Sequence, residues 1–168
     1  MHELAALITQ LTDTPLPLEP RTTLNAGTMR GGTGVNVLAA EVVCELDLRS
    51  ESAPTLKELA EQIEVLVRNA NREGVNVSAE LIGQRPSGEM SADHPIIKLG
   101  LDCLREQGLE PELSSGSKDA NIPLSSGLPA LVLGVTTGGS AHTINEFIDI
   151  EPIEKGMEQL VNFVGRVQ

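Results

Sequence analysis

The sequence predicts an α+β fold whose two halves follow different patterns. In the first half, stretches of helical periodicity are interspersed with stretches in which apolar and polar residues alternate, a pattern typical of an antiparallel sheet with one wet face. In the second half, helical patterns flank a near-continuous apolar run at residues 129–135, which favours a buried parallel strand. With 168 residues, the chain is long enough to bury a core of its own.

The first half reads as helix, strand, strand, helix, strand. An apolar face at Leu4, Leu7, Ile8 and Leu11 indicates the first helix. Alternation predicts strands at residues 22–29 and 42–49, joined by a glycine-rich turn at residues 30–36. A further strand is expected at residues 75–82. One more strand in front would complete a split β-α-β sandwich of ferredoxin type, so this block is expected to lack its first strand.

The helix between the second and third strands shows clear start and stop signals. Thr55 and Glu58 have the spacing of a capping box, and Gly74 is expected to close the helix. Its apolar face contains Leu56, Leu59, Ile63, Leu66, Val67 and Ala70. We therefore expect one continuous helix packed on the sheet.

The second half follows a linker at residues 83–89, which predicts domains at residues 1–85 and 86–168. A helix is expected from about residue 95 to 107, ended by Gly108, then a short strand at 110–113 and one or two helical turns at 119–124. The last helix is predicted to open at Pro152. It is expected to present Ile153, Met157, Leu160, Val161 and Val164 to the core.

The composition restricts the classes of partner. A formal net charge of -12 disfavours nucleic acid and anionic membrane surfaces, and no apolar run approaches the roughly 20 residues needed to span a bilayer. Small-molecule, peptide or protein partners are favoured instead. Cys44 and Cys103 lie far apart and are predicted to be reduced, as in a cytoplasmic protein. The chain starts almost directly in a helical pattern, so we expect it to be part of something longer.

Three polar segments are candidates for chemistry. Residues 30–36 form either a tight turn or a phosphate cradle, although the lysine typical of such a cradle is missing. Residues 114–121 run into a helix start that Ser117 or Asp119 could cap, or whose amides could hold a carboxylate. The third segment, 138–148, contains His142 and follows the buried strand, at the edge where open α/β sheets bind ligands.

His142 is either an inconsequential loop histidine or one ligand of a zinc site. Zinc binds neutral imidazole but needs three or four protein ligands. The other histidines, His2 and His94, lack metal-ligand spacing to His142 and are predicted to be caps or surface residues. The remaining ligands would then come from sequence outside this chain.

Four motifs, in this order, resemble one family. They are G-G-T-G-V-N-V with the acidic strand E-V-V-C-E-L-D-L-R, then I-G-Q-R-P-S-G, then G-S-K-D-A-N, then A-H-T-I-N-E-F-I. Together they resemble the zinc-dependent metallopeptidase and amidohydrolase family that includes carboxypeptidase G, acetylornithine deacetylase, succinyl-diaminopimelate desuccinylase and tripeptide aminopeptidase. The likeness covers nearly the whole chain.

The resemblance implies a catalytic α/β domain with two zinc ions, for which cobalt could substitute, and an inserted ferredoxin-like lid domain that forms a homodimer. On this resemblance His142 matches the last metal ligand, Asn36 a lid residue that reaches towards substrate, and Asp119 and Asn121 residues beside the substrate pocket. Lys118 stands where the family has threonine.

The family's other ligands and its glutamate general base lie upstream of the lid, in sequence that this chain does not contain. The resemblance therefore implies a fragment of an enzyme that cleaves a peptide or N-acyl amino acid amide bond. It needs the upstream catalytic half as a partner, and is predicted to be inactive and free of metal by itself. The alternative is a non-catalytic dimerisation or ligand-binding module of ferredoxin type.

Overall fold

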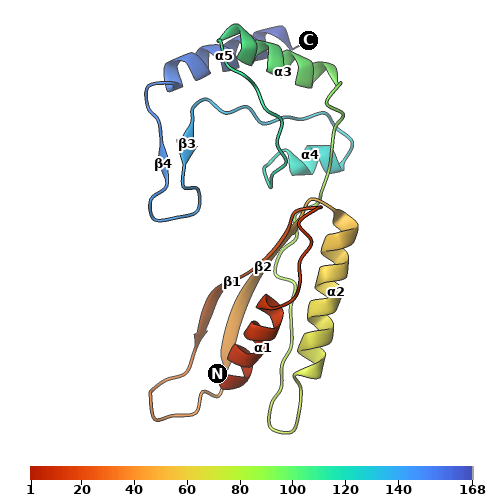
Figure 1. Cartoon of the computed structure of the whole chain (residues 1–168), viewed down its shortest axis with the longest axis vertical. Coiled ribbons are helices and arrows are strands. Elements are labelled where there is room, and N and C mark those ends of the chain that lie inside the picture. The colour runs from red at the N-terminus through yellow and green to blue at the C-terminus, as the bar shows by residue number, and fades with distance from the viewer. Residues whose placement is uncertain (168) are drawn as a thin grey trace. The chain divides into compact units, whose positions relative to one another are not determined.

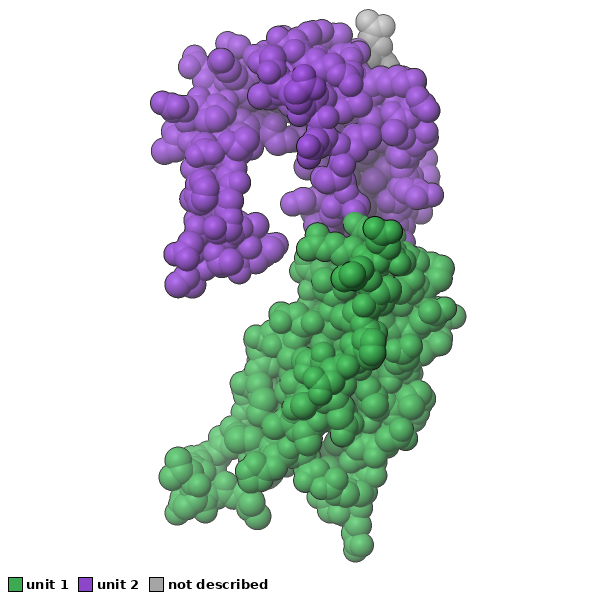
Figure 2. Space-filling model, in the orientation of Figure 1, with its two compact units in different colours: residues 1–83 green, residues 84–168 purple. Residues whose placement is uncertain are grey.

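The chain divides into two compact units, residues 1–83 and residues 84–168 (Figure 2). The computed structural model describes residues 1–167. Its elements are a mixture of helices and small antiparallel sheets, which confirms the predicted α+β class.

Unit 1 contains two helices and a two-stranded antiparallel sheet (Figure 1). Helix α1 spans His2–Thr12 and is followed by strands β1, Thr22–Gly31, and β2, Val42–Ser50. Helix α2 spans Ala53–Asn69. The register of the pair shifts between Ala26 and Thr28, which places a bulge at Gly27.

The core of unit 1 lies between the helices and the sheet. Helix α1 contacts β1, helix α2 contacts β2, and the two helices contact each other. The buried apolar side chains of this core are Leu7, Leu11, Leu59, Ile63 and Val67. Leucines of both strands pack partly buried against this cluster. The predicted apolar faces of both helices are therefore confirmed.

Helix α2 begins earlier and ends earlier than the sequence predicted. The residue at its N-cap is Ser52, whose hydroxyl oxygen accepts a hydrogen bond from the Thr55 main-chain N–H at 3.3 Å. The predicted capping box at Thr55 is therefore wrong: Pro54 fits the first helical turn, where no intrahelical donor is needed, so the helix can start before Thr55. At the other end, Gly74 lies in the turn after the helix, with φ +75°.

The strand predicted at residues 75–82 is not present. Beyond a single bridge between Arg72 and Val75, this segment pairs with no strand of the described residues. The side chain of Asn71 accepts the N–H of Val77 and donates to its carbonyl, each at 2.9 Å. Of the inward face predicted from the alternation, Val75 and Val77 are half-buried, but Ala79 and Leu81 are exposed. A strand also needs a neighbour with which to form a ladder, and this segment has none among the described residues.

Unit 2 is built on two long helices that pack together, α3 at Pro95–Glu106 and α5 at Ile153–Arg166. A short helix α4 spans Asn121–Ser125, and strands β3, Gly138–Gly139, and β4, Phe147–Ile148, form a small hairpin. The end of α3 is followed by Gly108 at φ +76°, the predicted stop.

An ion pair joins the last turns of α3 and α5. The Arg166 guanidinium donates from Nη1 to both carboxylate oxygens of Glu106 at 2.9 Å and lies 3.7 Å from the sulfur of Cys103. The hydrogen bond to Glu106 and the charge of that carboxylate raise the pKa of Arg166. Both cysteines are free: Cys103 is buried, and partial burial, followed by the nearby Glu45 carboxylate, raises the pKa of the Cys44 thiol.

The strands predicted at residues 110–113 and 129–135 are absent. The second segment turns Leu131 and Leu133 towards Gly100 of α3, while Val132 on its other side is 57% exposed. The prediction that this run is covered on both faces is therefore wrong, because only one layer of helices packs on it within the described part of the chain.

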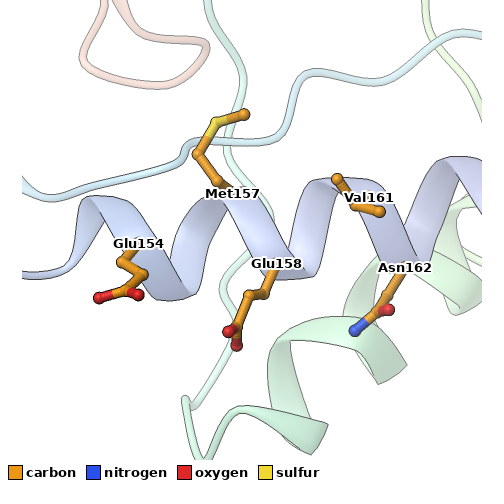
Figure 3. A pocket seen from close by; sticks show the side chains of 5 residues that line it. All are labelled: Glu154, Met157, Glu158, Val161 and Asn162. Carbon is orange, nitrogen blue, oxygen red and sulfur yellow. The ribbon is translucent and has the colours of Figure 1, made fainter.

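The buried face of α5 also differs from the prediction. Met157, Val161 and Val164 are 46%, 65% and 64% exposed, whereas Gly156, Gln159 and Phe163 are buried. The exposed side carries a shallow groove in which Met157 and Glu158 leave the helix in opposite directions (Figure 3). The reason for the rotation is Gly156, whose missing side chain lets the helix touch the main chain at Val135.

The close contact between Gly156 and Val135 predicts that one methyl group added at position 156 has a large effect on the stability of unit 2. A Cβ at position 156 would overlap the Val135 carbonyl oxygen, so Gly156→Ala is expected to destabilise unit 2 by about 1–3 kcal/mol. In the same helix nothing lies within 4 Å of a Cβ at Gly165, and Gly165→Ala is expected to stabilise by up to about 1 kcal/mol. Urea unfolding of both variants measures the difference; equal stabilities would contradict the close contact.

Candidate metal and substrate site

His142 lies in the loop of the β3–β4 hairpin. Gly138 pairs with Ile148, and Gly139 pairs with Phe147. A Cβ on Gly139 would come within 2.8 Å of the Phe147 ring, so the aromatic side chain occupies the space that the glycine leaves. The hairpin extends away from α3 and α5, with its loop at the far end (Figure 1).

The base of the hairpin is fastened by hydrogen bonds just before α5. The Asp149 N–H donates to the Thr137 carbonyl at 2.9 Å, and the Thr137 hydroxyl donates to the Asp149 carboxylate at 2.6 Å. The Thr136 hydroxyl donates to the Asp149 carbonyl. Because α5 begins at Ile153, these bonds fix both legs of the hairpin close to the start of that helix.

The loop has an unusual backbone. Ser140 and His142 have φ values of 55° and 64°, in the left-handed region that few side chains adopt. The Ser140 carbonyl accepts from the N–H of Thr143 at 3.1 Å and from its hydroxyl at 2.8 Å. The His142 N–H donates to a carboxylate oxygen of Glu146 at 3.1 Å. This role of Glu146 could not be predicted from the sequence, because a left-handed backbone at a histidine leaves no sequence signal.

The imidazole of His142 is exposed and unengaged. Its ring makes no hydrogen bond or ion pair with any residue of the described range 1–167. His2, at the first residue of α1, is likewise exposed, whereas His94 caps α3 by accepting the Ile96 N–H on Nδ1 at 3.2 Å. The predicted surface and cap roles of these two are confirmed.

Residues 1–167 contain no group of three or more His, Cys, Asp or Glu side chains arranged to hold a metal ion. The imidazole of His142 has the chemistry of a zinc ligand, because a neutral ring nitrogen can donate its lone pair. One such group fits one position of a zinc site.

Asn121 lies at the start of α4 and uses both ends of its side-chain amide. The oxygen accepts the Lys118 N–H at 2.7 Å, and the nitrogen donates to the Pro86 carbonyl at 3.2 Å. Close by, a Cβ on Gly88 would overlap the main chain at Ser125, so the end of the linker runs directly against α4. The substrate role predicted for Asn121 stays a prediction; the structure gives it a supporting role in this loop.

Asp119 precedes Asn121 in the same loop and is exposed. Its carboxylate forms no hydrogen bond or ion pair within residues 1–167, so it is available to a ligand. The N-cap of α4 is Ala120, with no side-chain hydrogen bond. The predicted capping by Ser117 or Asp119 is therefore wrong, because the Asn121 side chain satisfies the Lys118 N–H instead.

Asn36 lies in unit 1, in the turn that joins β1 and β2. The turn is entered through Gly32, at φ +80°, and it exposes Asn36 together with the neighbouring Val35 and Leu38, which are 109% and 91% exposed. The predicted turn at residues 30–36 is confirmed at its second half, since Arg30 and Gly31 still belong to β1.

None of the helices in the described part of the chain is long and apolar enough to cross a bilayer.

Comparison with known proteins matches most of the first unit to a described protein domain. A family model described as a peptidase dimerisation domain matches residues 1–75. The uncharacterized protein YqjE of Bacillus subtilis is 25% identical over 150 residues, which cover 88% of this chain and 40% of that protein. The crystal structure of aminopeptidase PepT from Bacillus cereus matches with a TM-score of 0.64 and 24% identity, over 97% of this chain and 44% of that one. The chain thus spans less than half the length of either protein.

The two side-chain hydrogen bonds of Asn121 are expected to contribute measurably to the stability of unit 2. Asn121→Ala removes both and is expected to destabilise unit 2 by about 1–2 kcal/mol. Asn162→Ala on the exposed side of α5 is the matched control and is expected to change stability by less than about 0.5 kcal/mol. Urea unfolding distinguishes them, and indistinguishable midpoints would show that the amide does not hold the loop.

Proposed function

We propose that this chain is the lid and C-terminal catalytic portion of a zinc-dependent metallopeptidase, a proposal supported by the peptidase dimerisation domain that matches residues 1–75. The proposed reaction is cleavage of a peptide or N-acyl amino acid amide bond. In this proposal residues 1–85 form the dimerisation lid, and residues 86–168 form part of the catalytic domain.

The observation that carries the proposal is the state of His142. Its ring is exposed at the end of a hairpin and engages no other described side chain, while hydrogen bonds hold the main chain beneath it. A histidine that served only to stabilise the loop would be expected to use its ring for this purpose, as His94 does at α3. This arrangement supports His142 as one ligand of a zinc ion.

A bound zinc would supply acidification of a water molecule and polarisation of the scissile carbonyl. Of this chain's residues, His142 would occupy one ligand position. The other ligands and the general base would come from polypeptide outside these 168 residues. The chain by itself is therefore proposed to lack hydrolytic activity.

The substrate-facing residues would be Asn36, Asp119 and Asn121. The exposed carboxylate of Asp119 and the exposed amide of Asn36 are free to hydrogen-bond a ligand. Asn121 would act through the loop that it holds, since both ends of its amide are already used. We propose that unit 1 forms a homodimer, supported by the dimerisation-domain match, and that the protein is cytoplasmic, supported by its two free cysteines.

The metal role is tested by reconstitution. The whole chain is mixed with the remaining part of the Bacillus cereus aminopeptidase, and cobalt binding is followed by visible absorption. His142→Ala is expected to weaken metal binding by the mixture at least about 10-fold, because it removes a direct ligand, whereas the exposed His2→Ala should have no effect.

The same samples are assayed on dipeptides and N-acyl amino acids with added zinc or cobalt. The chain alone is expected to show no turnover, and robust turnover by it would refute the proposed division of the active site. Metal affinity that His142→Ala leaves unchanged would refute the ligand assignment. No zinc binding by the mixture would favour a dimerisation or ligand-binding module without catalysis.

The homodimer is tested separately by light scattering on the purified chain. The expected mass is twice the 17.8 kDa of one chain at micromolar concentration. A single-chain mass over the whole micromolar range would contradict dimerisation through unit 1 and would leave the metal proposal to its own test.

A further inference from the structure

We propose that Glu146 is a positioning residue for His142. Its carboxylate accepts the His142 main-chain N–H at 3.1 Å and so fixes the direction in which the imidazole leaves the hairpin. The inference rests on the proposed function, in which the imidazole of His142 binds a metal ion.

The main chain at His142 must be held in an unfavourable conformation. His142 and Ser140 both adopt left-handed conformations, with φ of 64° and 55°, and only Ala141 separates them. Non-glycine residues in this region are strained and persist only when their surroundings determine them. The direction of the His142 side chain depends on this φ, so a loop that relaxed to an ordinary conformation would turn the imidazole elsewhere.

Hydrogen-bonded turns of the main chain bring Glu146 close to His142. The Thr143 N–H donates to Ser140, and the Glu146 N–H donates to the Thr143 carbonyl at 3.2 Å, so two successive turns bring residue 146 back beneath the start of the loop. The Glu146 side chain then folds over His142 and closes the loop with a hydrogen bond to an ionised acceptor, which is stronger than one to a neutral group.

The Glu146 carboxylate leaves both ring nitrogens of His142 free. It contacts the main chain of His142, so the loop is held without using either ring nitrogen. A carboxylate that accepted a hydrogen bond from the imidazole would orient it as a metal ligand, but it would occupy one of the two ring nitrogens. Here the support comes through the backbone, which makes Glu146 a positioning residue and not a ligand.

The test uses the whole chain and three variants. Glu146→Ala removes the acceptor, Glu146→Gln keeps an oxygen that can accept the same N–H, and Asn145→Ala is the control in the same loop because the Asn145 side chain makes no hydrogen bond within residues 1–167. The readouts are hydrogen exchange of the His142 amide and its N–H to Hα coupling, which reports φ.

We expect exchange of the His142 amide to become about 10-fold faster in Glu146→Ala, with a changed coupling. Glu146→Gln and Asn145→Ala should stay close to the parent chain. Unchanged exchange and coupling in Glu146→Ala would overturn the proposal, as would Glu146→Gln behaving like Glu146→Ala, because a residue that acts only through its accepting oxygen must be rescued by glutamine.

Cobalt binding in the reconstituted mixture separates this inference from the proposed function. If His142→Ala leaves metal affinity unchanged, the ligand assignment fails whatever Glu146 does. If His142→Ala and Glu146→Ala both weaken binding and Glu146→Gln restores it, positioning is supported. If Glu146→Gln restores the exchange rate of the amide but not metal binding, Glu146 is itself a ligand and the positioning role is overturned.

Discussion

The antiparallel pairing of β1 with β2 is the interaction on which unit 1 depends. Two strands alone are marginally stable in water, so the pair needs the helices that cover it. Each helix contacts a different strand, α1 on β1 and α2 on β2, and a change of register by one residue would turn Leu24, Leu46 and Leu48 away from both. The turn that carries Asn36 is the end of the same pair, so its position is set by that register.

Unit 2 holds the hairpin that carries His142 with almost no sheet. The Val135 main chain lies against α5 at Gly156, and the hydroxyls of the next two residues, Thr136 and Thr137, donate hydrogen bonds to Asp149. Asp149 in turn lies just before α5, so both legs of the hairpin are tied to one helix. The loop that carries His142 is therefore positioned by a close helix contact and a few hydrogen bonds, where a larger sheet would use a ladder.

The helices were predictable because their periodicity lies within one segment, although the capping signal at Thr55 is not the one that α2 uses. The strands predicted at residues 75–82 from alternation and at 129–135 from an apolar run are absent. Such patterns indicate which side chains can be buried, whereas a strand exists only where a second segment supplies hydrogen bonds. The rotation of α5 depends on a tertiary contact of Gly156, which a helical wheel treats as neutral. For the site, His142 could be selected from the sequence, but the bond of Asn121 to Pro86, 35 residues away, could not.

The comparison of His94 with His142 shows that neighbouring contacts, and not residue type, determine whether an imidazole is used in a structural hydrogen bond. His94 precedes a helix whose unpaired N–H groups need an acceptor, and Nδ1 of its ring supplies one. At His142 the group that needs an acceptor is the residue's own N–H, and Glu146 supplies it. At His142 a neighbouring carboxylate thus holds the strained main chain, and both ring nitrogens stay available.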